Sequence, residues 1–278
     1  GSGLVGSEMC IRDSYYTLLF GDKYRVKIAT RNVNIPGIQN FRDLGGYPSY
    51  STKKQVRWGM IYRSAEIDSL ECYSRRELRN LGIKTLIDLR TSSETGRQSP
   101  LQKEFNVVHI PLATGDMENI LKGIREEKIK SDTVYRMVEQ MNRDLIDKYT
   151  TEYRQIFDIL LDKNSYPVVI HCSSGKGRTG IVSALVLAAL GINEDIIMED
   201  YRLSNDYFNI PSASKDAYQL PARSQEAITT LFSAREDFLN AAKEEAECRY
   251  GDIDTYLQKG IGLNKNEIKR LRSILLSD

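Results

Sequence analysis

Short apolar runs alternate with amphipathic stretches through the middle of the chain. Runs at 85–89, 105–110 and 167–170 are rich in Val and Ile and are bounded by polar residues, which predicts buried strands. The stretches 74–82, 133–161 and 181–190 carry apolar residues at helical spacing or are continuously apolar. This alternation predicts an α/β fold with a central, mostly parallel sheet flanked by helices on both faces.

Local signals suggest where several helices begin and end. Ser74 and Glu77 have the spacing of a capping box, and Gly82 can close that helix in a left-handed conformation. The region 133–161 is too long for one ordinary helix, and the cluster at 149–151 predicts a break. A further helix is expected from about 194 to 208, and a further strand at 56–62.

The two ends of the chain differ in character. Residues 1–14 have no period and resemble a non-native leader, whereas 15–20 and 24–29 predict a β-hairpin. Residues 209–223 hold two prolines and two serines and suggest a loop or flap; helices are expected near 225–248, 253–259 and 265–276. We therefore expect one domain over 15–278, with 208–278 forming a helical lid and a C-terminal helical extension.

Composition narrows the classes of function. The 278 residues are 41% hydrophobic and 28% charged, with a net charge of +1, so the chain can bury a full core and has no bulk attraction for nucleic acid. The longest apolar run, 181–192, is shorter than the roughly 20 residues that span a bilayer. These features predict a soluble protein, cytoplasmic or exported, without a nucleic-acid partner or an integral membrane segment; they do not indicate an oligomeric state.

Cysteine and histidine usage argues against a metal site. The four cysteines, Cys10, Cys72, Cys172 and Cys248, form no CxxC pair, and the chain has two histidines. A structural zinc site needs four such ligands in close spacing. We expect no metal and no cofactor.

The stretch 167–180, PVVIHCSSGKGRTG, carries the clearest chemical signal. It predicts a strand that passes through a glycine-rich turn into a helix, which directs backbone N–H groups and the helix dipole to one point. That point favours a phosphate. Cys172 at the start of the turn should be ionised at neutral pH, and Arg178 can meet the same tetrahedral anion with its planar fork.

The residues HCSSGKGRTG resemble the signature loop of the cysteine-dependent protein tyrosine phosphatases. The segments 40–46 (NFRDLGG), 61–64 (IYRS), 81–90 (LGIKTLIDLR) and 198–205 (MEDYRLSN) are similar to the bacterial branch of that superfamily. The resemblance implies hydrolysis of phosphotyrosine, with phosphoinositides as possible substrates. In one departure, Gly177 stands where that branch has an aspartate, so an acid role of that aspartate must pass to another residue.

The resemblance assigns roles within the loop. Cys172 would attack phosphorus to form a cysteinyl-phosphate, and Arg178 with the loop amides would stabilise the transition state. Lys176 would add a second positive charge at the rim, favouring substrates with extra phosphates, or would simply be solvated. His171 would be structural, donating to a loop carbonyl. The expected substrate-binding residues are Ser173, Ser174, Gly175, Lys176, Gly177, Thr179 and Gly180.

The general acid is less well specified. Asp116 follows the 105–110 strand, where related phosphatases place a mobile acid loop, and it is the first candidate. Asp88 at the end of its strand is the second, with a salt bridge to Arg90 as its structural alternative. Arg42, Asp43 and Arg63 are interpreted as a charged group that holds loops together rather than as part of the active site.

Other functions remain to be weighed. Gly175, Gly177 and Gly180 also spell a dinucleotide fingerprint, but that motif requires neither cysteine nor arginine, and no second strand follows the helix. A sulfurtransferase fits poorly with the ending Arg178-Thr179-Gly180. An inositol phosphate or phosphoinositide phosphatase, and a phosphate-binding pseudophosphatase that acts as an interaction module, stay open.

Overall fold

The computed structural model describes residues 15–20, 24–68, 70–95, 100–214 and 217–277. Its central sheet has the strand order β3-β6-β9-β7-β8, in which β3 is antiparallel and the others are parallel. The strands are β3 (Arg42–Asp43), β6 (Ile61–Ser64), β9 (Val168–His171), β7 (Thr85–Asp88) and β8 (Asn106–His109). This confirms the predicted mostly parallel sheet, and the 167–170 run lies at its centre.

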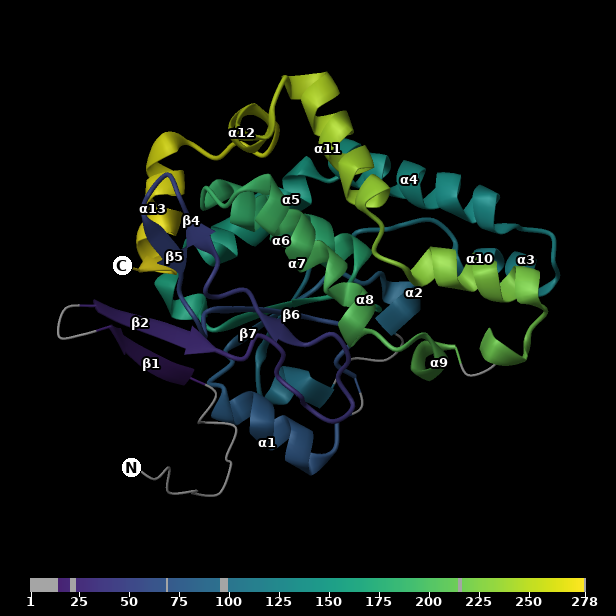
Figure 1. The fold of residues 1–278 in the computed structure, drawn as a ribbon, viewed down its shortest axis with the longest axis horizontal. Helices are drawn as coiled ribbons and strands as arrows, with labels where there is room; N and C mark the ends of the chain where they lie inside the picture. The colour runs from purple at the N-terminus through teal and green to yellow at the C-terminus, as the bar shows by residue number, and fades with distance from the viewer. Residues whose placement is uncertain (1–14, 21–23, 69, 96–99, 215–216, 278) are drawn as a thin grey trace.

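Side chains alternate between the two faces of this sheet, and each face has its own core. Leu86 and Val169 pack with Leu78 of helix α1, whereas Ile87 and Ile170 pack with residues of helices α5 and α6. Figure 1 shows α1 below the sheet and α5 and α6 above it. Helices therefore cover both faces, as the alternating pattern predicts.

Two strands and one helix show where local sequence signals succeeded or failed. The 56–62 run is not one strand: β5 (Lys54–Val56) ends before a turn, and β6 follows. The capping box at Ser74 is wrong, because α1 (Cys72–Asn80) begins earlier and the Ser74 hydroxyl donates to the carbonyl of Pro36 at 2.6 Å. Gly82 does follow the helix with a φ of 72°.

The remaining helices follow the chain as α2 (Ser92–Thr95), α3 (Met117–Arg125), α4 (Ser131–Lys148), α5 (Thr150–Leu160), α6 (Gly177–Ala189), α7 (Glu194–Arg202), α8 (Ser204–Tyr207), α9 (Ile210–Ala213), α10 (Ala222–Phe232), α11 (Glu236–Tyr250), α12 (Ile253–Thr255) and α13 (Lys265–Leu275). Short 3-10 helices lie at Pro100–Lys103, Lys163–Ser165 and Ala217–Gln219, and a π-helix, η5, at Tyr256–Gly260. The break near 149–151 is confirmed, whereas the stretch 225–248 is divided into two helices.

The predicted N-terminal hairpin is present as β1 (Tyr15–Phe20) paired with β2 (Tyr24–Ala29), and its turn lies outside the described residues, as does the 1–14 segment. A three-stranded sheet joins β4 (Pro48–Ser49), β5 and the C-terminal β10 (Leu276–Ser277). Among the described residues, none of the helices combines the length and apolar character needed to cross a bilayer.

Candidate active site

Cys172 lies at the carboxyl end of the central strand. β9 pairs with β6 on one side and with β7 on the other, and the chain then turns through 172–176 into α6. In open α/β sheets, ligands bind beyond the carboxyl ends of the strands. The loop 172–178 therefore opens at the position that the fold makes available for a substrate.

The backbone of this loop is held from behind by neighbouring strands. Gly175 has a φ of 66°, and a Cβ there would lie 2.4 Å from the carbonyl of Ser64. The Gly175 carbonyl accepts from Arg63 Nη2 at 2.7 Å, and the Ser174 carbonyl accepts from Asn40 Nδ2 at 3.1 Å. With these carbonyls held from behind, the loop amides are left on the opposite side.

A buried carboxylate, Asp200, anchors the arginines that hold the loop. Arg63 Nη1 lies 2.6 Å from Asp200 Oδ2, and Arg42 Nε lies 3.2 Å from Oδ1. Burial opposes ionisation of Asp200, but the charges of Arg42 and Arg63 more than offset it and lower its pKa to about 2. These contacts agree with the structural interpretation of Arg42 and Arg63.

Asp43, the third charged residue interpreted as holding loops together, contacts backbone amides. Its carboxylate accepts from the amides of Gly45 and Gly59, each at 2.7 Å. Sequence reasoning gave no role to Asp200, although it lies in the MEDYRLSN segment that carries the family resemblance.

Cys172 faces a small cavity of about 80 Å³ that is polar on one side and apolar on the other. The loop side includes Ser174, Lys176, Gly177 and Arg178 beside Cys172. Burial disfavours the thiolate, but the Arg178 charge, the Thr179 hydroxyl and the amides of Thr179 and Gly175 outweigh burial and lower the Cys172 pKa below its ordinary value. The sulfur is thus set up as a nucleophile.

The guanidinium of Arg178 forms an ion pair with the carboxylate of Glu94 in α2. The two Glu94 oxygens accept from Nη1 and Nη2 at 2.7 and 2.6 Å, and Nη1 also reaches the carbonyls of Leu89 and Leu112 at 3.3 Å. Burial raises the pKa of Glu94, but its pairing with Arg178 prevails and holds the pKa near 2. Among the described residues nothing accepts from Nε, which leaves that edge of the guanidinium for an oxyanion.

Glu94 also accepts from the hydroxyl of Ser173 at 2.7 Å, so it links α2 to both ends of the loop. Glu94 is not among the site residues expected from the sequence. It lies four residues after Arg90, in a stretch with no apolar period, and no local signal marks it.

Lys176 does not stand at a solvated rim, and this expectation is corrected. Its side chain is buried, and Nζ donates to the carbonyls of Leu231 at 2.7 Å and Ser233 at 3.0 Å. Burial lowers its pKa to about 8. The ammonium group ties the loop to the end of α10 instead of extending toward solvent.

The two acid candidates lie in different settings. Asp88 is buried and accepts from Arg90 Nε at 3.0 Å and Nη2 at 2.8 Å; burial opposes ionisation, but the Arg90 bonds dominate and its pKa is lowered. These contacts are the salt bridge with Arg90 that was the structural alternative to an acid role for Asp88. Asp116 is exposed and caps α3 through the amide of Asn119 at 3.0 Å, between Thr114 and Met117, which line the Cys172 cavity.

The other loop residues have mainly local contacts. His171 is buried, and burial lowers its pKa to about 4, so the ring is neutral at pH 7; its Nδ1 lies 3.9 Å from Asp88 and makes no hydrogen bond within the described chain. A Cβ on Gly180 would lie 2.8 Å from the Tyr201 ring, so Gly180 permits close packing of α6 on α7. A Cβ on Gly177 would meet nothing within 4 Å.

Helices α3, α4 and α10 cover the cavity. Met117, Val138, Met141, Leu231 and Phe232 line its apolar side, and helices α3, α4 and α10 share a hydrophobic cluster of their own. The expected flap, 209–223, supplies none of these lining residues; its described parts form α9, a 3-10 helix and the start of α10. The depth of the site is therefore set by α4 and the carboxyl end of α10.

Residues 33–277 match the Tyrosine phosphatase family. The chain belongs to this family. It is therefore a phosphoric monoester hydrolase, and the resemblance read from its motifs is confirmed.

Relatives of the family extend over most of the chain. The chain is 30% identical to the triple specificity protein phosphatase PtpB of Mycobacterium tuberculosis, over 87% of this chain and 98% of that protein. It is 25% identical to a tyrosine-protein phosphatase of Nostoc commune, over 76% of this chain and 72% of that protein. The solved catalytic core of Siw14 shares 15% identity over 77% of this chain and 95% of its own, with a TM-score of 0.37, too low to support an argument.

Proposed function

We propose that this protein hydrolyses phosphotyrosine through a cysteinyl-phosphate on Cys172. The observation that carries the proposal is the Cys172 thiol, with its lowered pKa, in one small cavity with Arg178. The sulfur attacks phosphorus, the P–O bond to the leaving group breaks, and a proton is delivered to the departing oxygen. Water then hydrolyses the thiophosphate and returns the thiolate.

Arg178 and the loop amides supply the electrostatic part of this reaction. The guanidinium edge at Nε and the amides of the loop can meet the equatorial oxygens as charge develops on them. Each charge-assisted hydrogen bond contributes about 1.5–3 kcal/mol. The expected substrate-binding role of 173–177, Thr179 and Gly180 is kept in this proposal as a role of the loop backbone.

The shape of the cavity supports an aromatic phosphate ester over a polyphosphorylated ligand. Met117, Met141 and Phe232 form an apolar cover that suits a ring, and Lys176, the residue that favoured extra phosphates, donates to carbonyls at the end of α10. Phosphoinositides remain the second candidate because the relative named triple specificity phosphatase accepts more than one class of substrate by its name.

Turnover of para-nitrophenyl phosphate tests the reaction class. We expect that the activity of the wild-type protein persists in EDTA and that Cys172→Ser has none. In the wild-type protein, rapid acid quench should trap a phosphorylated Cys172 that mass spectrometry detects. Loss of activity in EDTA would indicate a metal-dependent reaction, and a stoichiometric phosphate complex without turnover would indicate a pseudophosphatase. A panel of phosphotyrosine peptides, phosphoserine peptides and phosphoinositides then ranks substrate classes by kcat/KM.

A further inference from the structure

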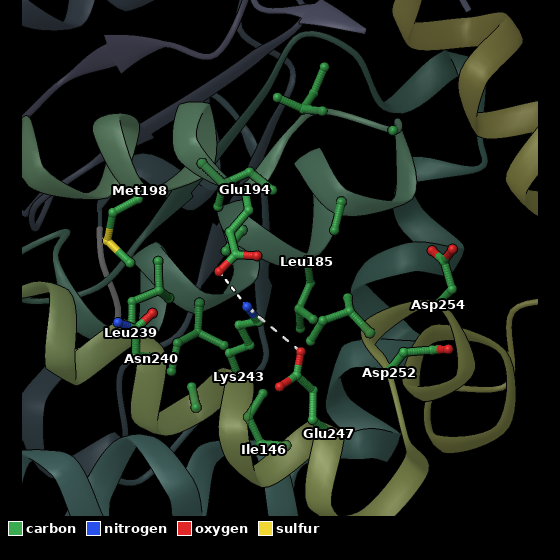
Figure 2. Close-up of a pocket in the computed structure, with 18 of the residues that line it drawn as sticks. Ile146, Leu185, Glu194, Met198, Leu239, Asn240, Lys243, Glu247, Asp252 and Asp254 are labelled. Carbon is green, nitrogen blue, oxygen red and sulfur yellow. Dashed lines mark hydrogen bonds and ion pairs between the residues drawn. The ribbon is translucent and has the colours of Figure 1, made fainter. Parts of the chain in front are cut away.

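A second and larger cavity lies farther along α6 and shares no lining residue with the Cys172 cavity. Its volume is about 670 Å³, within the roughly 300–1,000 Å³ typical of small-molecule sites. Helices α6, α7, α11 and α12 enclose most of it, as Figure 2 shows. We call it the α6–α11 cavity.

The floor of the α6–α11 cavity is apolar because small residues stand where the helices face one another. Ala184 and Ala188 occupy successive turns of α6, and Ala242 occupies the facing part of α11. Larger apolar side chains complete the floor, namely Ile146, Ile181, Leu185, Ile192, Ile197, Met198, Leu239 and Ile253. A floor of this kind gains free energy when an apolar group displaces water from it.

Charged side chains also line the cavity, and its carboxylates outnumber its cations. Lys243 bridges Glu194 and Glu247, with 3.7 Å between Nζ and Glu247 Oε1 (Figure 2). The single positive charge of Lys243 therefore faces two negative charges. Asp252 and Asp254 add two more carboxylates to the lining. Asp252 caps α12, accepting from the amide of Thr255 at 2.6 Å, and Lys259 acts on it electrostatically, whereas Asp254 has no ion pair among the described residues.

The second cationic residue of the lining, Arg272, offsets only part of this excess of negative charge. Arg272 directs Nε to the carbonyl of Ala189 at 2.8 Å, at the end of α6, so it is engaged with the backbone. Taken together, the lining has four carboxylates and two cations. An anionic amphiphile would meet net repulsion there, whereas a cationic one would meet attraction.

We propose that the α6–α11 cavity binds a small amphipathic cation, an amine on an alkyl or aryl body. The apolar body lies on Ala184, Ala188 and Leu239, and the ammonium group is placed near Asp252 and Asp254. The proposal does not depend on the chemistry of Cys172, because it concerns a separate site.

Matched ten-carbon probes test the charge preference. Decylamine, decanoate and decan-1-ol are titrated below their micelle concentrations into the full chain, with binding followed by calorimetry and thermal unfolding. Because surface ion pairs contribute modestly, we expect decylamine to bind about tenfold more tightly than decanoate. Equal binding of decanoate, or binding of none of the three, would overturn the proposal.

Two variants locate the binding. Ala188→Phe fills the floor and is expected to abolish decylamine binding, and Asp254→Asn is expected to narrow the ratio between decylamine and decanoate. Asp254 is exposed, so Asp254→Asn should not disturb folding. This variant therefore tests the proposal even if Ala188→Phe does not fold. Glu226→Gln, an exposed acid of α10 outside the cavity, is the control and should change nothing. Undiminished preference for decylamine in Asp254→Asn would contradict the assigned site.

Discussion

Glu94 binds the two terminal nitrogens of Arg178, while Nε of the guanidinium has no acceptor among the described residues. The two oxygens lie 2.6 and 2.7 Å from Nη2 and Nη1. A guanidinium held in this way needs little reorganisation when phosphate arrives, which is how preorganised donors stabilise a transition state. Glu94 therefore serves as a positioning residue in the proposed mechanism.

Replacing Glu94 with Ala should lower kcat for para-nitrophenyl phosphate about 10- to 100-fold, because one charge-assisted pair contributes about 1.5–3 kcal/mol. Steady-state kinetics at pH 6 to 7 measure the change, and Glu118→Ala, an exposed acid of α3, is the matched control. An increase in activity would instead mean that Glu94 competes with phosphate for Arg178.

Asp116→Asn tests the proposed general acid. We expect kcat to fall by a factor of roughly 10² to 10⁴ and the alkaline decline of its pH profile to disappear, since a proton donor must be protonated to act. The fall should be smallest for esters with acidic leaving groups. Asp88→Asn should instead lower the Tm and keep the alkaline decline, because Asp88 pairs with Arg90; the opposite pattern would transfer the acid role to Asp88.

A pair of glycine variants separates backbone strain from open space in the loop. Gly175→Ala forces a Cβ to 2.4 Å from the Ser64 carbonyl at a φ of 66°, so it should destabilise the fold by about 1–3 kcal/mol or more and remove activity. Gly177→Ala meets no atom within 4 Å and should leave the Tm nearly unchanged. Thermal unfolding and turnover measure both, and equal losses in the two variants would refute the strain argument.

Asp200 gives the protein a defined acid sensitivity. Its folded pKa of about 2 lies below the unfolded value of about 3.9, so its contribution is present above that value and is lost as the pH falls toward 2. Asp200→Asn leaves Arg42 and Arg63 buried without their partner, and at pH 7 should cost roughly 3–5 kcal/mol of unfolding free energy.

The difference between wild-type and Asp200→Asn should shrink between pH 4 and pH 2, where the wild-type carboxylate takes up its proton. Thermal melts across this range provide the measurement. A gap that stays constant with pH would show that the cost comes from packing and not from charge.

The parts of the fold that could be predicted are those that local periodicity determines. Apolar runs located β7, β8 and β9, and the polar break at 149–151 divided α4 from α5. Helix α3 is not among the predicted helices, although Met117, Ile120, Leu121 and Ile124 have helical spacing behind Asp116, where the expectation covers only an acid loop. Ser74 was misassigned because its hydroxyl bonds to Pro36, a partner 38 residues away.

The loop 172–178 could be predicted from the sequence because its residues are contiguous. The side chains that hold the loop in place could not be predicted, because they lie far away in the sequence. Glu94 meets Arg178 across 84 positions, and Asp200 meets Arg63 across 137. No local signal separates Glu94 from an exposed acid, and Asp200 is marked only by its place in the MEDYRLSN segment. Lys176 was misplaced for the same reason, since its partners are carbonyls of a helix end that only the packing of α10 brings near.

The pairing of β10 with β5 has a consequence for biosynthesis. Leu276 is aligned with Val56, and the amide of Arg57 bonds to the carbonyl of Leu275 at 2.7 Å. On the ribosome, residues 48–56 therefore emerge long before the strand that completes their sheet. The small sheet can close only after translation has passed residue 277, and until then β5 offers an unpaired edge to chaperones or to neighbouring nascent chains.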